Sequence, residues 1–230
     1  MGVGIAFPLD TFDVMDVDIS RLSDYREDGW PQLDEDEEKK KSSMISMIQF
    51  GQRMLQRGIQ TFLHPVRSML QIYPETKSID HWQLSENRHN ILLFCRLRVK
   101  DKNQSCKKEF CISNYHMPCA FYAPMVMNIH AEMVAKRSQS MASGDPLILA
   151  GDFNFMPDSP HYSLVTTGNL SKDDVTYPTP KYGLEWKSTI EPMRSAYAES
   201  TNGEPDFTNF AQVNFMKQNN CFVFSQHIVY

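Results

Sequence analysis

The chain has 230 residues, of which 41% are hydrophobic and 22% charged, a composition typical of a globular protein with one buried core. Its formal net charge of −5 excludes the bulk basic charge on which non-specific nucleic-acid binding depends, although a local basic groove stays open. The negative charge is uneven, because residues 24–41 hold eight acids against four bases.

The cysteines and the chain's apolar runs bear on its compartment. The five cysteines (Cys95, Cys106, Cys111, Cys119 and Cys221) include no C-x-x-C pair, which favours free thiols in a reducing compartment. No apolar run reaches transmembrane length, and the first residues lack the basic region of a signal peptide. We therefore expect a cytoplasmic protein, with the nucleus as the alternative, that does not associate with a membrane.

The first third of the chain predicts two strands and then a charged insertion. Residues 3–7 and 12–17 have the apolar content of strands. Residues 20–41 are polar and predict an exposed loop, and a helix is expected from Ser42 to about Arg57, where its apolar residues share one face. We expect one domain over residues 1–230, with an acidic and helical insertion at about 20–80.

The middle of the chain predicts a hairpin followed by a helix. Residues 90–99 and 109–115 have strand character and are separated by a polar turn, and His116 stands where the second strand ends. Arg96 and Arg98 share one face of the first strand, which favours a solvated strand face over phosphate binding. A helix is expected to begin at Pro124 and to run to about residue 141.

A short apolar run at residues 147–150 predicts a buried strand that delivers Asp152 and Asn154. Alternation puts these two side chains on the same side, and a carboxylate beside an amide suits phosphate chemistry. The alternative is a local Asx turn with no functional role. Ser159 and Pro160 then predict a helix start, and Gly168 predicts its end.

Several segments carry a resemblance to a known family. They are Gly151-Asp152-Phe153-Asn154 followed by Pro157, Ser159, Tyr162 and Gly168; Asn114-Tyr115-His116; residues 194–197 with Glu204-Pro205 and residues 207–209; and residues 2–7. In this order and spacing they resemble the deoxyribonuclease-I-like endonuclease/exonuclease/phosphatase superfamily. Within it, the pattern is similar to the branch of the carbon-catabolite-repressor deadenylases, nocturnin, the Angel proteins and the 2′,5′-phosphodiesterase.

The resemblance implies an α/β fold, a four-layer sandwich of two facing mixed sheets flanked by helices. It implies a phosphoric-ester hydrolase that uses Mg²⁺, with Mn²⁺ as the alternative. Asp152 would activate water and take part in metal binding, Asn154 would hold the scissile phosphate, and His116 would donate to a phosphate oxygen. We also expect substrate contacts from Arg88, Phe155 and Asn209, with packing under the loop as the alternative for Phe155.

The chain departs from the family pattern near both of its ends. The family's metal-binding Glu lies upstream of the segment that residues 2–7 resemble, and its terminal Leu-Asp-Tyr-Ile and Ser-Asp-His segments have no clear counterpart after residue 213. We therefore expect an incomplete sandwich, truncated at both ends, with a divergent tail at residues 214–230. The loss of a carboxylate ligand would weaken Mg²⁺ binding.

Three functions follow from these observations. The first is a metal-dependent nuclease or phosphodiesterase that acts on RNA or a nucleotide. The second is a catalytically impaired, truncated isoform that binds a substrate, or a protein partner through residues 20–80. The third is a phosphatase acting on a small phospho-compound such as an inositol phosphate or a sphingolipid.

Overall fold

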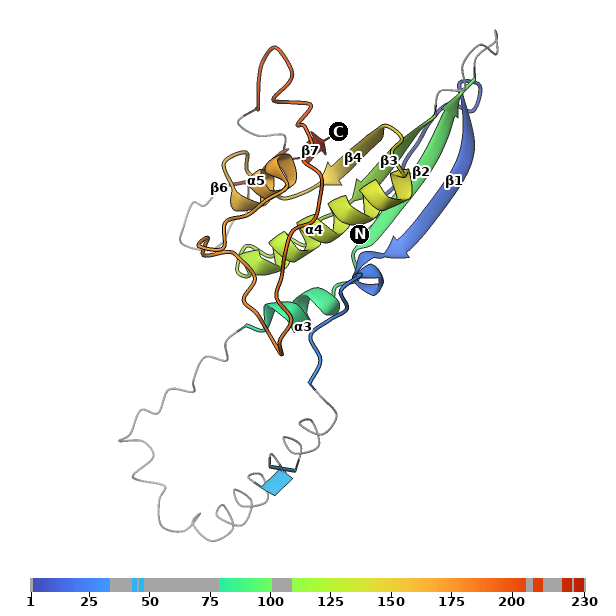
Figure 1. Ribbon diagram of the computed structural model, residues 1–230. Helices are drawn as coiled ribbons and strands as arrows, with labels where there is room; N and C mark the ends of the chain where they lie inside the picture. The colour runs from blue at the N-terminus through green and yellow to red at the C-terminus, as the bar shows by residue number, and fades with distance from the viewer. Residues whose placement is uncertain are drawn as a thin grey trace. The chain divides into compact units, whose positions relative to one another are not determined.

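A five-stranded mixed sheet organises the chain (Figure 1). The computed structural model describes residues 2–33, 43–44, 46–47, 79–100 and 109–205, and the backbone of residues 209–212, 221–224 and 226–229. The sheet order is β1-β2-β3-β4-β7, with β1 at Phe12–Arg21, β2 at Ile91–Val99, β3 at Glu109–Tyr115, β4 at Leu147–Asp152 and β7 at Gln226–Val229. Only β3 and β4 pair in parallel; the other neighbours in this sheet are antiparallel.

A second ladder and four helical segments complete the described elements. The strands β5 (Asn209–Gln212) and β6 (Cys221–Phe224) form a separate antiparallel pair. The helical segments are η1 (Leu22–Tyr25), α3 (His81–Glu86), α4 (Pro124–Ala142) and α5 (Pro160–Thr167). No helix in the described ranges is long and apolar enough to cross a membrane. The predicted α/β class is confirmed.

The helix α4 lies along one face of the sheet (Figure 1). In the register of β2, β3 and β4, every second residue of each strand points to the same face of the sheet. The apolar side chains on the face toward α4 are buried. They include Leu92, Phe94, Tyr115 and Leu149, none more than 1% exposed. Burying such side chains is the main favourable contribution to folding, at about 25 cal/mol for each Å² of apolar surface.

The opposite face of the sheet also carries apolar side chains, and its exposure is uneven: the apolar residues of β1 on this face are exposed, whereas Cys95 of β2 is only 4% exposed. Val17 and Ile19 of β1 are 49% and 70% exposed, and their cross-strand partners Cys95 and Leu93 lie on the same face. Further along this face, Ile112 and Ile148 are half-buried. The sheet is therefore apolar on both faces, as in folds that bury a sheet between two layers.

Most predicted elements of the region from residue 90 to residue 168 are confirmed. The hairpin of β2 and β3, the helix α4 and the strand β4 fall where the sequence pattern placed them. Helix α5 begins with Ser159 as its N-cap, which accepts a hydrogen bond from the backbone N–H of Tyr162 at 3.3 Å. It ends at Gly168, whose φ of 74° is left-handed.

Two expectations for the first ninety residues are wrong, and one helix was not expected. Residues 3–7 form no strand. Residues 20–25 are not an exposed loop, because β1 continues to Arg21 and η1 buries Leu22 completely. The helix α3, which the sequence left unassigned, begins after Asp80, whose carboxylate accepts a hydrogen bond from the N–H of Gln83. An isolated apolar residue such as Leu22 gives no periodic signal, so its burial depends on tertiary packing.

The predicted helix at residues 42–57 and the divergent tail lie largely outside the described residues. Residues 43–44 and 46–47 are helical. The chain divides into two compact units, one of Met1–Trp30 with Asp80–Tyr230 and the other of Pro31–Ile79. The boundaries of the insertion and of the tail stay predictions.

A buried histidine joins α4 to β3 and α3. The Nε2–H of His130 donates to the carbonyl oxygen of Ser85 at 3.1 Å, and its Nδ1 accepts from the hydroxyl of Tyr115 at 2.7 Å. Burial lowers the pKa of His130 to about 4, so the ring is neutral at physiological pH. A neutral ring can donate from one nitrogen and accept at the other, which satisfies both groups without burying a charge.

The ends of β3 and β4 approach each other too closely for a side chain at residue 151. Gly151 has a φ of 141°, a conformation that only glycine adopts readily. A Cβ atom at this position would lie 1.9 Å from the carbonyl oxygen of Tyr115 and 3.0 Å from the side chain of Asn114. The glycine therefore lets the end of β4, with Asp152 as its last residue, lie close to His116, which follows Tyr115.

We expect Gly151→Ala to destabilise the protein by about 3 kcal/mol or more, because the strained φ and the contact with a backbone oxygen add. Urea denaturation followed by circular dichroism would measure the loss. The matched control is Gly144→Ala, which has a φ of 89° but whose Cβ would meet nothing within 4 Å. It should cost only about 1–2 kcal/mol. Equal losses in the two variants would contradict the role of the close contact.

Candidate functional site

His116 and Asp152 meet at one edge of the sheet. Their positions follow from the parallel register, in which Asn114 of β3 lies opposite Ala150 of β4, so both strands end at the same edge. The Nε2 atom of His116 lies 3.8 Å from Oδ2 of Asp152. The side chains are 32% and 25% exposed, so both remain accessible to a ligand. The structure thus brings together two of the predicted catalytic residues.

Asn154 lies beside Asp152 through a local turn. Its backbone N–H donates to Oδ1 of Asp152 at 3.2 Å, and its φ of 53° is left-handed, a region that Asn tolerates. The Asx turn that the sequence left as an alternative therefore forms, and it orients the carboxylate toward His116. The amide nitrogen of Asn154 donates to the carbonyl oxygen of Met117 at 3.1 Å, and the residue is 5% exposed.

Two further bonds fix the backbone on either side of His116. The side-chain amide of Asn90 donates to the carbonyl oxygen of His116 at 2.7 Å. The N–H of Met117 donates to the carbonyl oxygen of Asp152 at 2.8 Å, which continues the pairing of the two strands by one step. Asn90 was not singled out as a functional residue from the sequence, where its only signal is its place as the first residue of a predicted strand.

A cavity of about 500 Å³ opens beside His116. Its lining residues are Gly2, Val3, Asn87, Arg88, His89, Asn90, Ile91, His116, Met117, Pro118 and Cys119. Arg88 is one of these residues, and its Nη2 atom donates a hydrogen bond to the hydroxyl of Tyr122 at 3.1 Å. Its Nε atom is buried and has no hydrogen-bond partner among the described residues. A buried donor of this kind favours an anionic ligand in the cavity.

Cys119 also lines this cavity but is not activated as a nucleophile. Partial burial and the nearby carboxylate of Asp152 raise the pKa of its thiol, and Arg88 opposes the shift. The thiol therefore stays protonated at neutral pH. The His116–Asp152 pair is therefore the candidate for chemistry at this edge of the sheet.

Phe155 packs under the loop and does not face the cavity. It is 3% exposed, and its ring stacks on that of His161 with centroids 5.4 Å apart. His161 in turn donates from Nδ1 to Oδ1 of Asn128 on α4 at 2.6 Å. The expectation that Phe155 contacts substrate is corrected, because its buried ring is not accessible to a nucleotide base of a substrate. Its stacking on His161 agrees with the alternative of packing under the loop.

The remaining predicted contacts have different outcomes. Asn209 begins β5, but its side chain lies outside the described part of the chain, so its role stays a prediction. Arg96 is not simply solvated: its Nη2 donates to the carbonyl oxygens of Met141 and Ala142 at the end of α4, where a cation is favoured. Arg98 pairs with Glu109 across the hairpin.

The described residues supply little of a metal site. No group of three or more His, Cys, Asp or Glu side chains lies close enough to hold an ion in the described ranges. Asp152 offers one carboxylate, and Mg²⁺ commonly binds through one or two carboxylates together with water and substrate phosphate. The donor set therefore fits a metal only in part.

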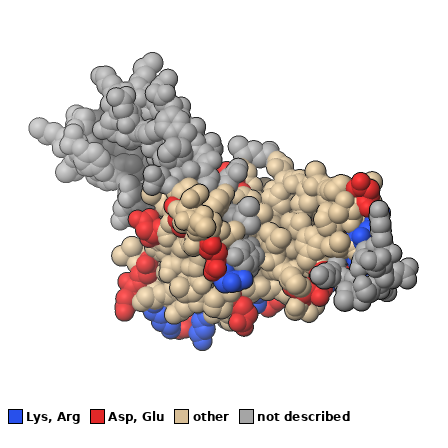
Figure 2. All heavy atoms as spheres, turned by 90° about the horizontal axis from the view of Figure 1, so that it is seen from above, with Lys and Arg blue, Asp and Glu red and all other residues tan. Residues whose placement is uncertain are grey.

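Charge at the surface matches the composition. On the face shown in Figure 2, the acidic and basic side chains lie interspersed near the edges of the described region, and much of the centre is uncharged. This face carries no continuous basic patch among the described residues. On this face, a nucleic-acid ligand would therefore be held through local contacts and not through a broad basic surface.

Comparisons with known proteins give partial matches to this chain. No protein-family model matches the chain. The Angel protein of Drosophila melanogaster is 33% identical over 94 residues, which cover 41% of this chain and 26% of that protein. The 2′,5′-phosphodiesterase 12 of Mus musculus is 24% identical over 119 residues, which cover 50% of this chain and 19% of that protein. The matches thus span about a quarter or less of these relatives.

A solved structure shares the fold. ANGEL2, described as a 2′,3′-cyclic phosphatase in complex with adenosine-2′,3′-vanadate, superposes with a TM-score of 0.50 over 97% of this chain and 57% of that chain, at 15% identity. The sequence matches to the Angel protein and to 2′,5′-phosphodiesterase 12 support the resemblance to the endonuclease/exonuclease/phosphatase superfamily, and the likeness to ANGEL2 supports the fold.

Proposed function

We propose that the chain carries the hydrolytic residues of a phosphoric-ester hydrolase that acts on a phosphodiester of RNA or of a nucleotide. The observation that carries this proposal is the approach of His116 Nε2 to within 3.8 Å of Asp152 Oδ2, beside the cavity that holds Arg88. The relatives include a 2′,5′-phosphodiesterase and a 2′,3′-cyclic phosphatase, which are phosphoric-ester hydrolases by name.

The two side chains suit two separate roles, with Asp152 as a proton acceptor and His116 as a donor. Asp152 is held through Oδ1 by the N–H of Asn154, so Oδ2 is oriented to accept a proton from an attacking water. His116, whose Nε2 atom lies 3.8 Å from Oδ2 of Asp152, can donate a hydrogen bond to a phosphate oxygen as negative charge develops in the transition state. Asn154 would hold a phosphate oxygen through the second hydrogen of its amide, since Met117 accepts only the first.

The cavity suits a ligand of nucleotide size. Its volume of about 500 Å³ falls in the range that small-molecule sites occupy. Arg88, with its buried Nε donor, would bind a phosphate oxygen, and a guanidinium does so with more than one hydrogen bond. The same cavity could take the end of an RNA strand or a small phospho-compound, so the substrate proposal rests on the relatives' names as well as on size.

Mg²⁺, with Mn²⁺ as the alternative, is the cofactor that we propose. Asp152 and Asn154 provide oxygen atoms of the kind that Mg²⁺ prefers, and the substrate's phosphate would provide others. When bound, the ion would offset negative charge on the phosphate. One carboxylate alone is a weak anchor, which favours a second candidate function: a protein that binds a phosphoester but hydrolyses it poorly.

A second sheet against the open face of the first would complete the proposed four-layer sandwich. The exposed apolar side chains of that face, among them Val17 and Ile19, support this proposal. Facing sheets in such folds pack about 10 Å apart with their side chains interleaved. A protein partner that binds through residues 20–80 remains a proposal without support from the described residues.

We expect Asp152→Asn to lower the rate of phosphodiester hydrolysis by about 10²-fold or more, because the amide cannot accept a proton from water. The assay would follow a short oligoadenylate and bis-p-nitrophenyl phosphate with Mg²⁺. The matched control is Asp158→Asn, which removes an exposed carboxylate six residues on and should leave the rate within about twofold. A wild-type rate equal to that of Asp152→Asn would favour the binding-only candidate.

We expect Arg88→Ala to raise KM for an anionic substrate by about tenfold or more, since a hydrogen bond to a charged group contributes about 1.5–3 kcal/mol. Arg88→Lys should recover part of that loss, because it keeps the charge but not the paired donors. Steady-state kinetics would separate KM from kcat. Arg98→Ala, which breaks a pair with Glu109 on the hairpin, is the control. A kcat loss with an unchanged KM would contradict a binding role.

A further inference from the structure

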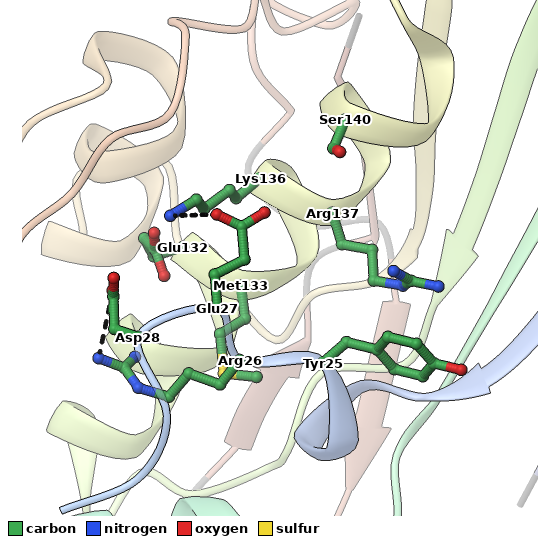
Figure 3. Close-up of a pocket in the computed structure, with 9 residues that line it drawn as sticks. All are labelled: Tyr25, Arg26, Glu27, Asp28, Glu132, Met133, Lys136, Arg137 and Ser140. Carbon is green, nitrogen blue, oxygen red and sulfur yellow. Dashed lines mark ion pairs between the residues drawn. The ribbon is translucent and has the colours of Figure 1, made fainter.

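A second crevice, which shares no lining residue with the cavity beside His116, lies between α4 and the turn that follows η1 (Figure 3). It has a volume of about 130 Å³. Its lining residues are Tyr25, Arg26, Glu27, Asp28, Glu132, Met133, Lys136, Arg137 and Ser140. Nothing in the proposed hydrolysis uses this crevice.

Each basic side chain that lines the crevice already has an acidic partner. The pairs are Lys136 with Glu27 at 2.9 Å, Arg26 with Asp28 at 3.7 Å, and Arg137 with Asp18 at 3.3 Å. Figure 3 shows the first two as dashed lines. Three bases are thus matched by three acids, before the carboxyl group of Glu132 is counted.

Glu132 is the surplus acid of this crevice. It is 3% exposed, and its Oε1 atom is buried with no hydrogen-bond partner among the described residues. Burial raises the pKa of its carboxyl group to about 7. The positive charges of Lys136 and Arg26 lower this pKa, and the negative charges of Asp28 and Glu27 raise it. A buried carboxylate without a donor is costly, and here a proton supplies the missing positive charge near neutral pH.

Arg26 is not free to supply that charge instead. Its guanidinium lies over the rings of Trp30 and Trp82, at 5.5 Å and 4.9 Å from their centroids. Its Nε–H donates to the carbonyl oxygen of Gly29 at 2.6 Å. These contacts hold Arg26 beside Asp28, and no described side chain donates a hydrogen bond to Oε1 of Glu132.

We propose that this crevice binds a small molecule carrying a primary ammonium group, with Glu132 as its anionic partner. An ammonium group brings one positive charge and three donors, which matches one surplus carboxylate. A divalent metal fits less well, because the described residues form no cluster of three or more His, Cys, Asp or Glu ligands. Met133 offers apolar surface for a short carbon chain.

The same carboxyl group predicts a pH dependence of stability. Its pKa is raised from 4.5 to about 7 on folding, so the folded state holds the proton more tightly than the unfolded chain. This contribution to stability is fully present below about pH 4.5 and is lost as the pH rises through about 7. In urea denaturation between pH 5 and 8, Glu132→Gln should lose less stability with rising pH than the wild type. Parallel profiles would contradict the burial of an unpaired acid.

Binding of ethylammonium to the full chain tests the proposal directly. Ligand-observed NMR and thermal unfolding would follow a titration at pH 8, with tetramethylammonium, which lacks N–H donors, at matched ionic strength. We expect saturable binding of ethylammonium only, weakened about tenfold at pH 6, where about one-tenth of a group with a pKa of about 7 is ionised.

Two variants test whether the ammonium group binds at Glu132. Glu132→Gln should weaken binding at least tenfold, whereas Glu27→Gln, which removes a carboxylate from the exposed rim, should change it less than about threefold. Equal binding to wild type and Glu132→Gln would overturn the proposal. So would the absence of saturable binding, or an affinity that does not change between pH 6 and 8 in the wild type, a result that needs no variant to fold.

Discussion

The parallel pairing of β3 with β4 is the constraint on which the candidate site depends. Because the two strands run in the same direction, His116 and Asp152 leave the sheet at the same edge, and their side chains come within 3.8 Å. Gly151 permits this approach, since any side chain there would meet the carbonyl oxygen of Tyr115. A register slip of one residue would turn Asp152 to the other face of the sheet. Backbone geometry, and not a long side chain, therefore sets the site.

Buried polar residues of α4 connect this pair of strands to the rest of the fold. His130 holds Tyr115, the last residue of β3, and Asn128 holds His161, which supports the loop after Asp152 through Phe155. Burial lowers the pKa of both histidines to about 4, so they act as neutral donors and acceptors. Further along this helix, Oε1 of Glu132, Nε of Arg137 and Oγ of Ser138 are buried without a hydrogen-bond partner in the described region, and Glu132 is the only acid among the three.

Much of this region was predictable from local signals. The N-cap at Ser159, the glycine at Gly168 and the apolar run of β4 each act over a few residues, and each predicted its element correctly. The pairing of His116 with Asp152 came only from family resemblance, because parallel strands bring together residues that no periodicity connects. Burial of Leu22 and Phe155, and the helix α3, depend on tertiary contacts that the sequence pattern does not carry. The crevice at Glu132 is of the same kind, since α4 and residues 25–28 are distant in the chain.

The central claim is that His116 and Asp152 act on one phosphate as a unit. A double-mutant cycle tests it most directly: kcat/KM for phosphodiester hydrolysis in the wild type, His116→Gln, Asp152→Asn and the double variant. Residues that act together lose little more as a pair than singly, so the account predicts that the double variant falls within about tenfold of the slower single variant. Losses that multiply across the two sites, or a wild type no faster than either single variant, would contradict it.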